Sequence, residues 1–159
     1  MKILKRFVLP TAFVLLLLAI DQFTKHLAVT YLRPIREIVL IDGVFSLLYH
    51  ENSGMAFGLF QDGRWFFVVV TVLALGFFIY YYASLPKTRY HSRMRFFLLM
   101  LIGGALGNFV DRLLQGYVVD FFFFSLINFP VFNMADVFLV IAVFALAIII
   151  LFTKEPKNG

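Results

Sequence analysis

Four long apolar stretches constrain this chain more than any other feature of its sequence. They cover about residues 7–31, 65–82, 96–114 and 132–152. At 1.5 Å per residue, a helix of about 20 residues crosses the hydrocarbon core of a bilayer, which is about 30 Å thick. A water-soluble fold would expose large apolar patches, because 62% of the residues are hydrophobic and only 14% are charged. The sequence therefore predicts an all-α membrane protein with four transmembrane helices, in a single integral membrane domain over residues 1–159.

The first stretch also resembles a secretory signal, because Lys2, Lys5 and Arg6 precede an apolar run. A cleaved signal peptide would need a small-x-small cleavage site, and none precedes Asp21. The apolar periodicity also continues beyond this point, through Phe23 and further. We therefore expect an uncleaved first helix.

Basic residues gather before the first stretch, between the second and third, and after the fourth. They include Lys2, Lys5, Arg6, Lys87, Arg89, Arg93, Arg95, Lys154 and Lys157. Such clusters mark the cytoplasmic side of a membrane protein. Both termini are therefore expected in the cytoplasm, and the connections 32–64 and 115–131 on the outer side. Short clusters between apolar runs do not form a basic groove, so no nucleic-acid partner is predicted.

The first outer connection carries a strong hairpin signal. Asp42-Gly43 separates two apolar runs, residues 38–41 and 44–49, and Asp-Gly between such runs is typical of a tight β-turn. The sequence thus predicts a small extramembrane β element on the outer face. The run 121–124 in the second outer connection fits either a strand or an interfacial segment.

Polar side chains gather near the outer ends of the stretches, where a polar group in lipid is costly and is a candidate for function. On a helix that begins near residue 7, Asp21 lies about 21 Å from the inner end. The inner ends of the stretches carry no carboxylate, which disfavours a proton-coupled transporter, since proton pathways need polar groups through the membrane. The group consists of Asp21, Lys25, Asn108, Asp111, Arg112, Asp120, Asn133 and Asp136.

Several of these residues have a purely structural interpretation. Asp21 and Lys25 are four residues apart, so they can neutralise each other on one face of a helix. Asp111 and Arg112 can form a pair at a helix end. The glycine-rich segment 103–107 has the small-xxx-small spacing of a close helix contact.

Asp120 and Asp136 are harder to explain structurally, because each is flanked by apolar residues. Two carboxylates in apolar surroundings on neighbouring elements are what an aspartic peptidase needs. One acts as general base on a water molecule, and the other donates a proton to the scissile peptide. We therefore expect Asp120 and Asp136 to be the catalytic pair. The sequence leaves open which is the base and which the acid.

Five segments, spread over nearly the whole chain, resemble motifs of the lipoprotein signal peptidase family, also called signal peptidase II. In order, they are Asp21-Gln22-Phe23-Thr24-Lys25, Asn52-Ser53-Gly54-Met55-Ala56-Phe57-Gly58, Gly103-Gly104-Ala105-Leu106-Gly107-Asn108 with Asp111-Arg112, Val118-Val119-Asp120-Phe121, and Phe132-Asn133-Met134-Ala135-Asp136.

The resemblance implies an endopeptidase of the bacterial inner membrane that removes the signal peptide from prolipoproteins. It implies cleavage just before a diacylglyceryl-modified cysteine, with the active site toward the periplasmic or outer face. It further implies inhibition by the cyclic peptide globomycin, contact with membrane lipid, and no cofactor.

The resemblance also implies substrate-binding or site-supporting roles for further residues. Asn133 comes three residues before Asp136, so on a helix it would face the same side. Asn108 and Arg112 would hold carbonyls of the scissile peptide, and the glycine of the outer loop would allow close backbone approach. The residues concerned are Asn52, Gly54, Asn108, Arg112 and Asn133.

Other peptidase mechanisms have weaker support in the sequence. His50-Glu51 begins like a zinc motif, but Gly54 stands where the second histidine should be. No metal site is therefore expected, and the absence of cysteine excludes thiolate ligands and a cysteine nucleophile. A serine–lysine peptidase is a further alternative, for which Ser53 and Lys25 would form the pair; it has weaker support than the two aspartates. A non-catalytic membrane scaffold would leave the two isolated aspartates unexplained.

Overall fold

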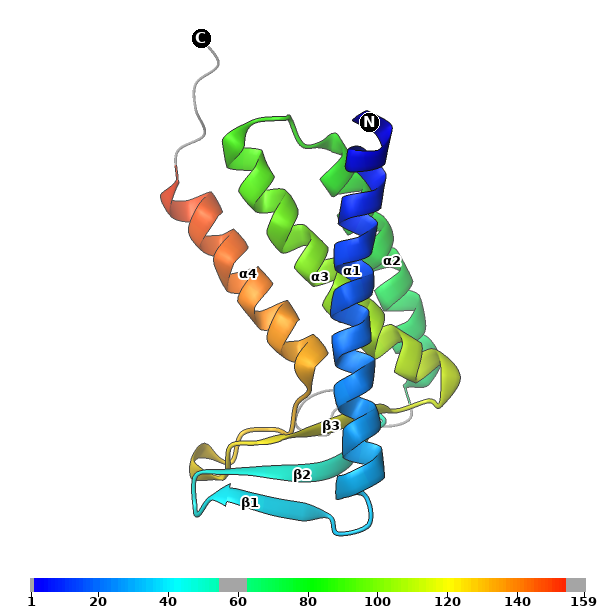
Figure 1. Ribbon diagram of the computed structural model, residues 1–159, viewed down its shortest axis with the longest axis vertical. Coiled ribbons are helices and arrows are strands. Elements are labelled where there is room, and N and C mark those ends of the chain that lie inside the picture. Colours follow the sequence, from blue (N-terminus) through cyan, green and yellow to red (C-terminus); the bar gives the residue numbers. More distant parts are fainter. Residues whose placement is uncertain (1, 55–62, 154–159) are drawn as a thin grey trace.

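A computed structural model describes residues 2–54 and 63–153 of the chain. In this part, four long helices form a bundle, and a small β-sheet lies across one end of it (Figure 1). The helices are α1 (Lys2–Leu27), α2 (Arg64–Ser84), α3 (Arg89–Leu114) and α4 (Met134–Phe152). Each is long and apolar enough to cross a membrane, α1 together with the π-helical turn η1 (Ala28–Leu32) that follows it. The predicted membrane fold with four spans is confirmed.

The first helix begins at Lys2, a few residues before the apolar stretch that starts near residue 7, and the starts of the third and fourth helices also differ from the sequence-based bounds. The third helix begins at Arg89 rather than at residue 96, because the Thr88 side chain caps it by accepting a hydrogen bond from the backbone N–H of His91. The fourth helix begins at Met134 rather than at residue 132, because Phe132 is held in a β-bridge with Phe122. Caps and bridges rather than hydrophobicity set these two boundaries.

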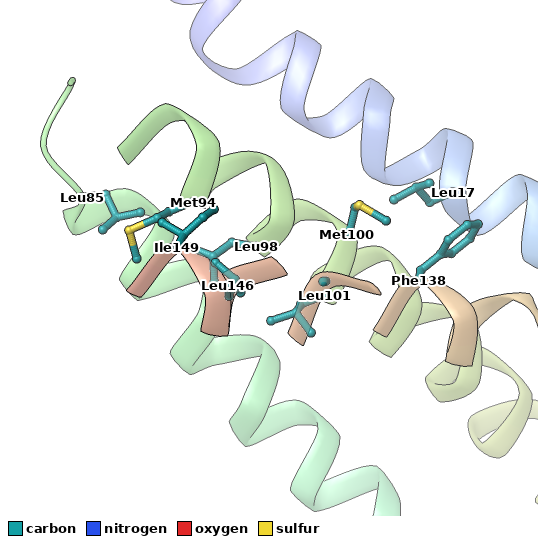
Figure 2. Packing of buried hydrophobic residues seen from close by; sticks show 10 residues of the cluster. Leu17, Leu85, Met94, Leu98, Met100, Leu101, Phe138, Leu146 and Ile149 are labelled. Atoms are coloured by element: carbon teal, nitrogen blue, oxygen red, sulfur yellow. The ribbon is translucent and has the colours of Figure 1, made fainter. Parts of the chain in front are cut away.

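Helix α3 is the centre of the bundle, since it packs against α1, α2 and α4. Figure 2 shows the largest apolar cluster, which contains Leu17 of α1, Met100 and Leu101 of α3, and Phe138 and Leu146 of α4. Large apolar faces of the helices stay exposed outside this cluster. That pattern is expected of helices whose outer faces are solvated by lipid.

Three glycines of α3 let its neighbours approach closely. A Cβ added at Gly103 would lie 2.9 Å from the Leu17 side chain of α1, and one at Gly104 would lie 2.6 Å from the backbone oxygen of Ala135 in α4. At Gly107 it would lie 2.5 Å from the carboxylate of Asp21. The glycine-rich segment is therefore the close helix contact that its spacing predicted.

We expect Gly104→Ala to destabilise the protein by about 1–3 kcal/mol, because a backbone carbonyl cannot yield to the added methyl group without moving the start of α4. Gly76→Ala is the matched control. Gly76 lies inside α2 with nothing within 4 Å of the added Cβ, so alanine there should stabilise by about 0.5–1 kcal/mol. Thermal melting of both variants in detergent micelles measures the difference. Equal changes in melting temperature for the two variants would contradict the role of Gly104 in the close contact between α3 and α4.

The sheet has three antiparallel strands in the order β1 (Glu37–Ile41), β2 (Phe45–Asn52) and β3 (Val118–Phe123). Strands β1 and β2 form the hairpin predicted at Asp42-Gly43, and Gly43 adopts the left-handed φ of 67° that the turn requires. The third strand comes from the second outer connection and pairs with β2, which places Asp120 opposite His50. Residues far apart in the sequence thus meet at the helix ends.

Candidate active site

Asp120 lies in the middle of β3 and is 2% exposed. Both of its oxygens accept hydrogen bonds from amide side chains. Asn52 on the neighbouring strand β2 donates to Oδ2 at 2.9 Å, and Asn133 donates to Oδ1 at 2.6 Å. The pairing of β2 with β3 therefore positions this carboxylate.

Asp136 lies in the first turn of α4 and is held by a capping box. The Asn133 side-chain oxygen accepts from the backbone N–H of Asp136, and the Asp136 carboxylate accepts from the backbone N–H of Asn133, both at 3.1 Å. Asn108 of α3 donates to the other carboxylate oxygen at 2.8 Å. A carboxylate at this position also interacts favourably with the helix dipole.

Asn133 joins the two carboxylates. It is fully buried, and its side-chain NH₂ donates to Asp120 and to the Asn108 oxygen, while its backbone N–H donates to Asp136. The expectation that Asn133 lies inside the helix is wrong, because Asn133 is the N-cap residue, but the expectation that it faces Asp136 is confirmed. Its extended backbone is what allows its side chain to reach both the helix and β3.

The surroundings of Asp120 favour its protonated form. Burial raises the pKa of the Asp120 carboxyl to about 7, and the negative charge of Asp136 acts in the same direction. Hydrogen bonds from Asn52 and Asn133 oppose this increase in pKa. The pair can thus hold one proton near neutral pH.

The raised pKa of Asp120 predicts a pH-dependent cost in stability. Between about pH 4 and pH 7 the folded protein retains a proton on Asp120 that the unfolded chain has lost, so the contribution of Asp120 to the free energy of unfolding falls as pH rises and levels off above pH 7. The full effect is on the order of 4 kcal/mol. Asp120→Asn removes this cost, so its stability advantage over wild type should grow from pH 4 to pH 7. Thermal melts of both proteins across this range test it, and an advantage independent of pH would contradict it.

A second polar cluster lies beside the first, between α1 and α3. Lys25 contacts Asp21 at 2.8 Å and Asp111 at 2.9 Å, and it donates to the Asn108 oxygen at 3.0 Å. Lys25, Asp21 and Asp111 are all buried. The predicted Asp21–Lys25 pair is therefore present as part of a larger cluster, which Asn108 connects to the Asp136 carboxylate.

The predicted helix-end pair of Asp111 with Arg112 is wrong. Adjacent residues on a helix point in different directions, and Asp111 faces Lys25 of α1. Arg112 instead donates to the backbone oxygen of Gly54 at 3.1 Å, and its guanidinium lies 4.8 Å from the ring centroid of Phe67. Arg112 thus holds the described end of the outer-loop motif; Met55, Ala56, Phe57 and Gly58 lie outside the described residues.

Two functions of α1 residues were missed by the sequence analysis. Asp21 accepts a hydrogen bond from the backbone N–H of Ala135 at 2.9 Å, so it satisfies one of the free N–H groups at the start of α4. Gln22 donates to Asp111 at 2.9 Å. The sequence indicates only that the first N–H groups of the fourth helix need acceptors; it does not indicate that Asp21 supplies one.

A cavity of about 550 Å³ brings most of the predicted site residues together. One wall is apolar. It includes Phe124 and Phe129, which follow β3 in the sequence, and Val140 and Ile141 on the exposed face of α4. Asn133, Asp21 and Lys25 are buried and do not line the cavity. The polar wall is formed by Asn52, Gly54, Asn108, Arg112, Asp120 and Asp136.

The other proposed chemistries find little support in the described part of the chain. Among residues 2–54 and 63–153, no three His, Asp or Glu side chains are grouped so that they could hold a metal ion. The Lys25 side chain is 4% exposed, and its ammonium is held by two carboxylates. It is therefore poorly placed to act as the base for Ser53.

Comparison with known proteins identifies the family. The family model described as signal peptidase (SPase) II matches residues 13–152. The chain belongs to the signal peptidase II family. Lipoprotein signal peptidases from Streptococcus pyogenes serotypes M5 (strain Manfredo) and M18 (strain MGAS8232) are each 39% identical to it over 150 residues, which cover 91% of this chain and 93% of the relative.

Solved structures share the fold of this chain. Two bacterial membrane enzyme structures, determined by the in meso method at 2.3 and 1.9 Å resolution, superpose with TM-scores of 0.83 and 0.80. Both are 29% identical to this chain; the first covers 96% of it and 95% of the solved chain, and the second 93% and 96%. The resemblance noted in the sequence is confirmed, and this member of the signal peptidase II family is a multi-pass bacterial membrane protein.

Proposed function

We propose that this protein is an aspartic endopeptidase that removes the signal peptide from prolipoproteins by cleaving just before a diacylglyceryl-modified cysteine. The observation that carries the proposal is the linkage of two carboxylates through Asn133 at the polar wall of an otherwise apolar cavity. Both similar streptococcal proteins are lipoprotein signal peptidases. Acyl chains fit the wall formed by α4, while the peptide bond lies at the carboxylates.

The proposed mechanism assigns the two carboxyl groups different roles. Asp136 accepts a proton from a water molecule as the water oxygen attacks the scissile carbonyl carbon. Asp120, whose pKa is raised to about 7, donates its proton to the carbonyl oxygen. When the C–N bond breaks, the proton on Asp136 passes to the leaving amine, and the proton of one hydroxyl of the tetrahedral intermediate returns to Asp120 as the new carboxyl group forms.

The neighbouring residues suit positioning roles in this reaction. Asn52 and Asn108 hold the carboxylates through their NH₂ groups, so we assign Asn108 to the orientation of Asp136 in addition to any contact with substrate. Among the described residues, no acceptor pairs with the buried Nε–H of Arg112. Arg112 lines the cavity, and we assign this donor to a carbonyl of the bound substrate. Gly54 places its backbone beside the same wall.

The charge distribution supports an orientation with both termini in the cytoplasm. The sheet and the carboxylates would then lie at the outer surface of the bacterial inner membrane. At this height the lipid on the substrate cysteine remains in the leaflet while water reaches the peptide bond.

Cleavage of a purified diacylglyceryl-modified precursor tests the proposal directly. We expect cleavage that globomycin blocks and that exhaustive chelation leaves unchanged, since neither carboxylate is proposed to bind a metal. The matched control is the same precursor without the lipid, which should be cleaved much more slowly. Equal cleavage of both precursors would contradict the substrate assignment. Loss of activity on chelation, restored by zinc, would contradict the aspartic mechanism.

A further inference from the structure

One corner of the sheet is unusually apolar for a connection outside the helices. This corner, residues 124–129, contains the short 3₁₀ turn η3 (Ser125–Ile127) and directly follows β3. Leu126 and Ile127 are each 69% exposed, and Phe129 is 45% exposed. No charged residue occurs between positions 121 and 135. A loop in water would ordinarily carry polar or charged side chains at its tip.

Three backbone N–H groups of the corner donate to backbone oxygens of the protein, two of them within the corner itself. The N–H of Leu126 donates to the backbone oxygen of Val44, that of Asn128 to Ser125 and that of Phe129 to Phe124, at distances between 3.1 and 3.4 Å. Asn128 adopts a left-handed conformation to close this turn. Internal pairing of N–H groups is what a segment needs where little water is available.

The position of the corner relative to α4 identifies what it meets. Figure 1 shows that the sheet extends sideways past the lower end of α4, with the η3 turn at its far corner. Ile127 and Phe129 line the same cavity as Val140 and Ile141 of α4. These α4 residues are 54% and 47% exposed on a transmembrane helix, so lipid covers them. The corner therefore continues the lipid-covered surface of α4.

We propose that residues 124–129 form a membrane anchor, in which Leu126 and Ile127 insert into the leaflet on the sheet side of the bundle. The occupant of this surface is the acyl and headgroup region of the bilayer that the four helices cross. Strand β3 carries Asp120 and leads directly into the corner, so the anchor sets the height of this carboxylate relative to the lipid. This inference depends on the membrane location of the helices and is independent of the proposed reaction.

Because the sequence contains no cysteine, a single cysteine introduced into the anchor can be labelled specifically. A nitroxide attached to Leu126→Cys, in the full-length protein in phosphatidylethanolamine–phosphatidylglycerol liposomes, reports its surroundings through relaxation by oxygen and by a water-soluble nickel chelate. Phe144→Cys on α4, where the native side chain is 67% exposed, is the lipid-facing reference. Glu37→Cys, at an exposed acidic position at the start of β1, is the water-facing control.

We expect the label at position 126 to favour oxygen over the nickel chelate by several-fold, as at position 144, and the label at position 37 to favour the chelate. Ile127→Cys should give the same result as Leu126→Cys, which guards against a local effect of one label. Accessibility to the chelate equal to that at position 37 would overturn the proposal. Protection from both reagents together with spin–spin broadening would also overturn it, because a second copy of the chain would then cover the corner.

Discussion

Asp120→Asn and Asp136→Asn should each lower the rate of precursor cleavage by about 10²–10⁴-fold while the protein still inserts and folds. Asparagine retains the shape of aspartate, and its carbonyl oxygen can still accept from Asn133 or Asn108. It cannot exchange a proton with water or with the leaving amine. A single general acid or base contributes a rate factor of about this size. A gel-shift cleavage assay of each purified variant, beside a thermal melt, measures both expectations.

The double variant separates a catalytic pair from two independent contributions. Groups that act as one unit are strongly non-additive, so Asp120→Asn/Asp136→Asn should be hardly slower than either single variant. Globomycin should still bind the folded variants, with reduced affinity, because the apolar wall of the cavity is unchanged. Independent contributions would instead multiply the two losses in rate.

Glu51→Gln is the matched control for loss of a carboxylate on the same sheet. Glu51 lies next to Asn52 on β2, but it accepts a hydrogen bond from Tyr49 and contacts Arg33, and it is not part of the cavity wall. Its activity should stay within a few-fold of wild type. If Asp120→Asn or Asp136→Asn also stayed within tenfold of wild type, that aspartate would not belong to the catalytic pair.

The membrane spans could be predicted from sequence because hydrophobicity alone decides whether a segment of this length is stable in lipid. The hairpin was predictable for a similar reason, since Asp42-Gly43 specifies the turn locally. Helix boundaries were less accessible. The start of α3 at Arg89 depends on a side-chain cap in a charged segment, and the start of α4 depends on the bridge between Phe132 and β3.

The site residues were recognisable by type, but their partners were not. Asp120 and Asp136 stood out because each lacks a charged neighbour in sequence. The contact of Lys25 with Asp111, and the cap that Asp21 provides for α4, join residues on different helices. Such contacts depend on how α1, α3 and α4 pack. Neither helical periodicity nor residue spacing within one helix contains that information.

The Lys25 cluster provides the prediction with the largest expected effect on stability. Lys25→Met keeps most of the apolar stem but removes the ammonium that contacts both Asp21 and Asp111. Two carboxylates then remain buried without the ammonium that contacts both, and breaking a buried ion pair in this way typically costs about 3–5 kcal/mol. We expect a loss of this size in the free energy of unfolding, measured by circular dichroism in mixed micelles.

Arg33→Met is the control for removal of a basic side chain near the same end of α1. Arg33 lies 3.7 Å from Glu51, and the two side chains are 59% and 38% exposed. Exposed pairs contribute about 0–1 kcal/mol, because water and salt screen the charges. The control should therefore melt within a few degrees of wild type. A comparable loss of stability in both variants would show that the buried Lys25 cluster contributes no more to stability than an exposed ion pair.

A second substitution shows whether Lys25 stabilises the protein through its charge or through packing of its stem. The direction in which it changes the stability of Lys25→Met decides between the two. If Lys25→Met destabilises because two carboxylates face each other without a cation, adding Asp111→Asn removes one of the charges and should restore part of the lost stability. Asparagine can still accept the hydrogen bond from Gln22, so the remaining contacts are kept. If the lysine acts mainly through packing of its stem, the second substitution should destabilise further. A double variant more stable than Lys25→Met alone thus supports the electrostatic role, and one less stable contradicts it.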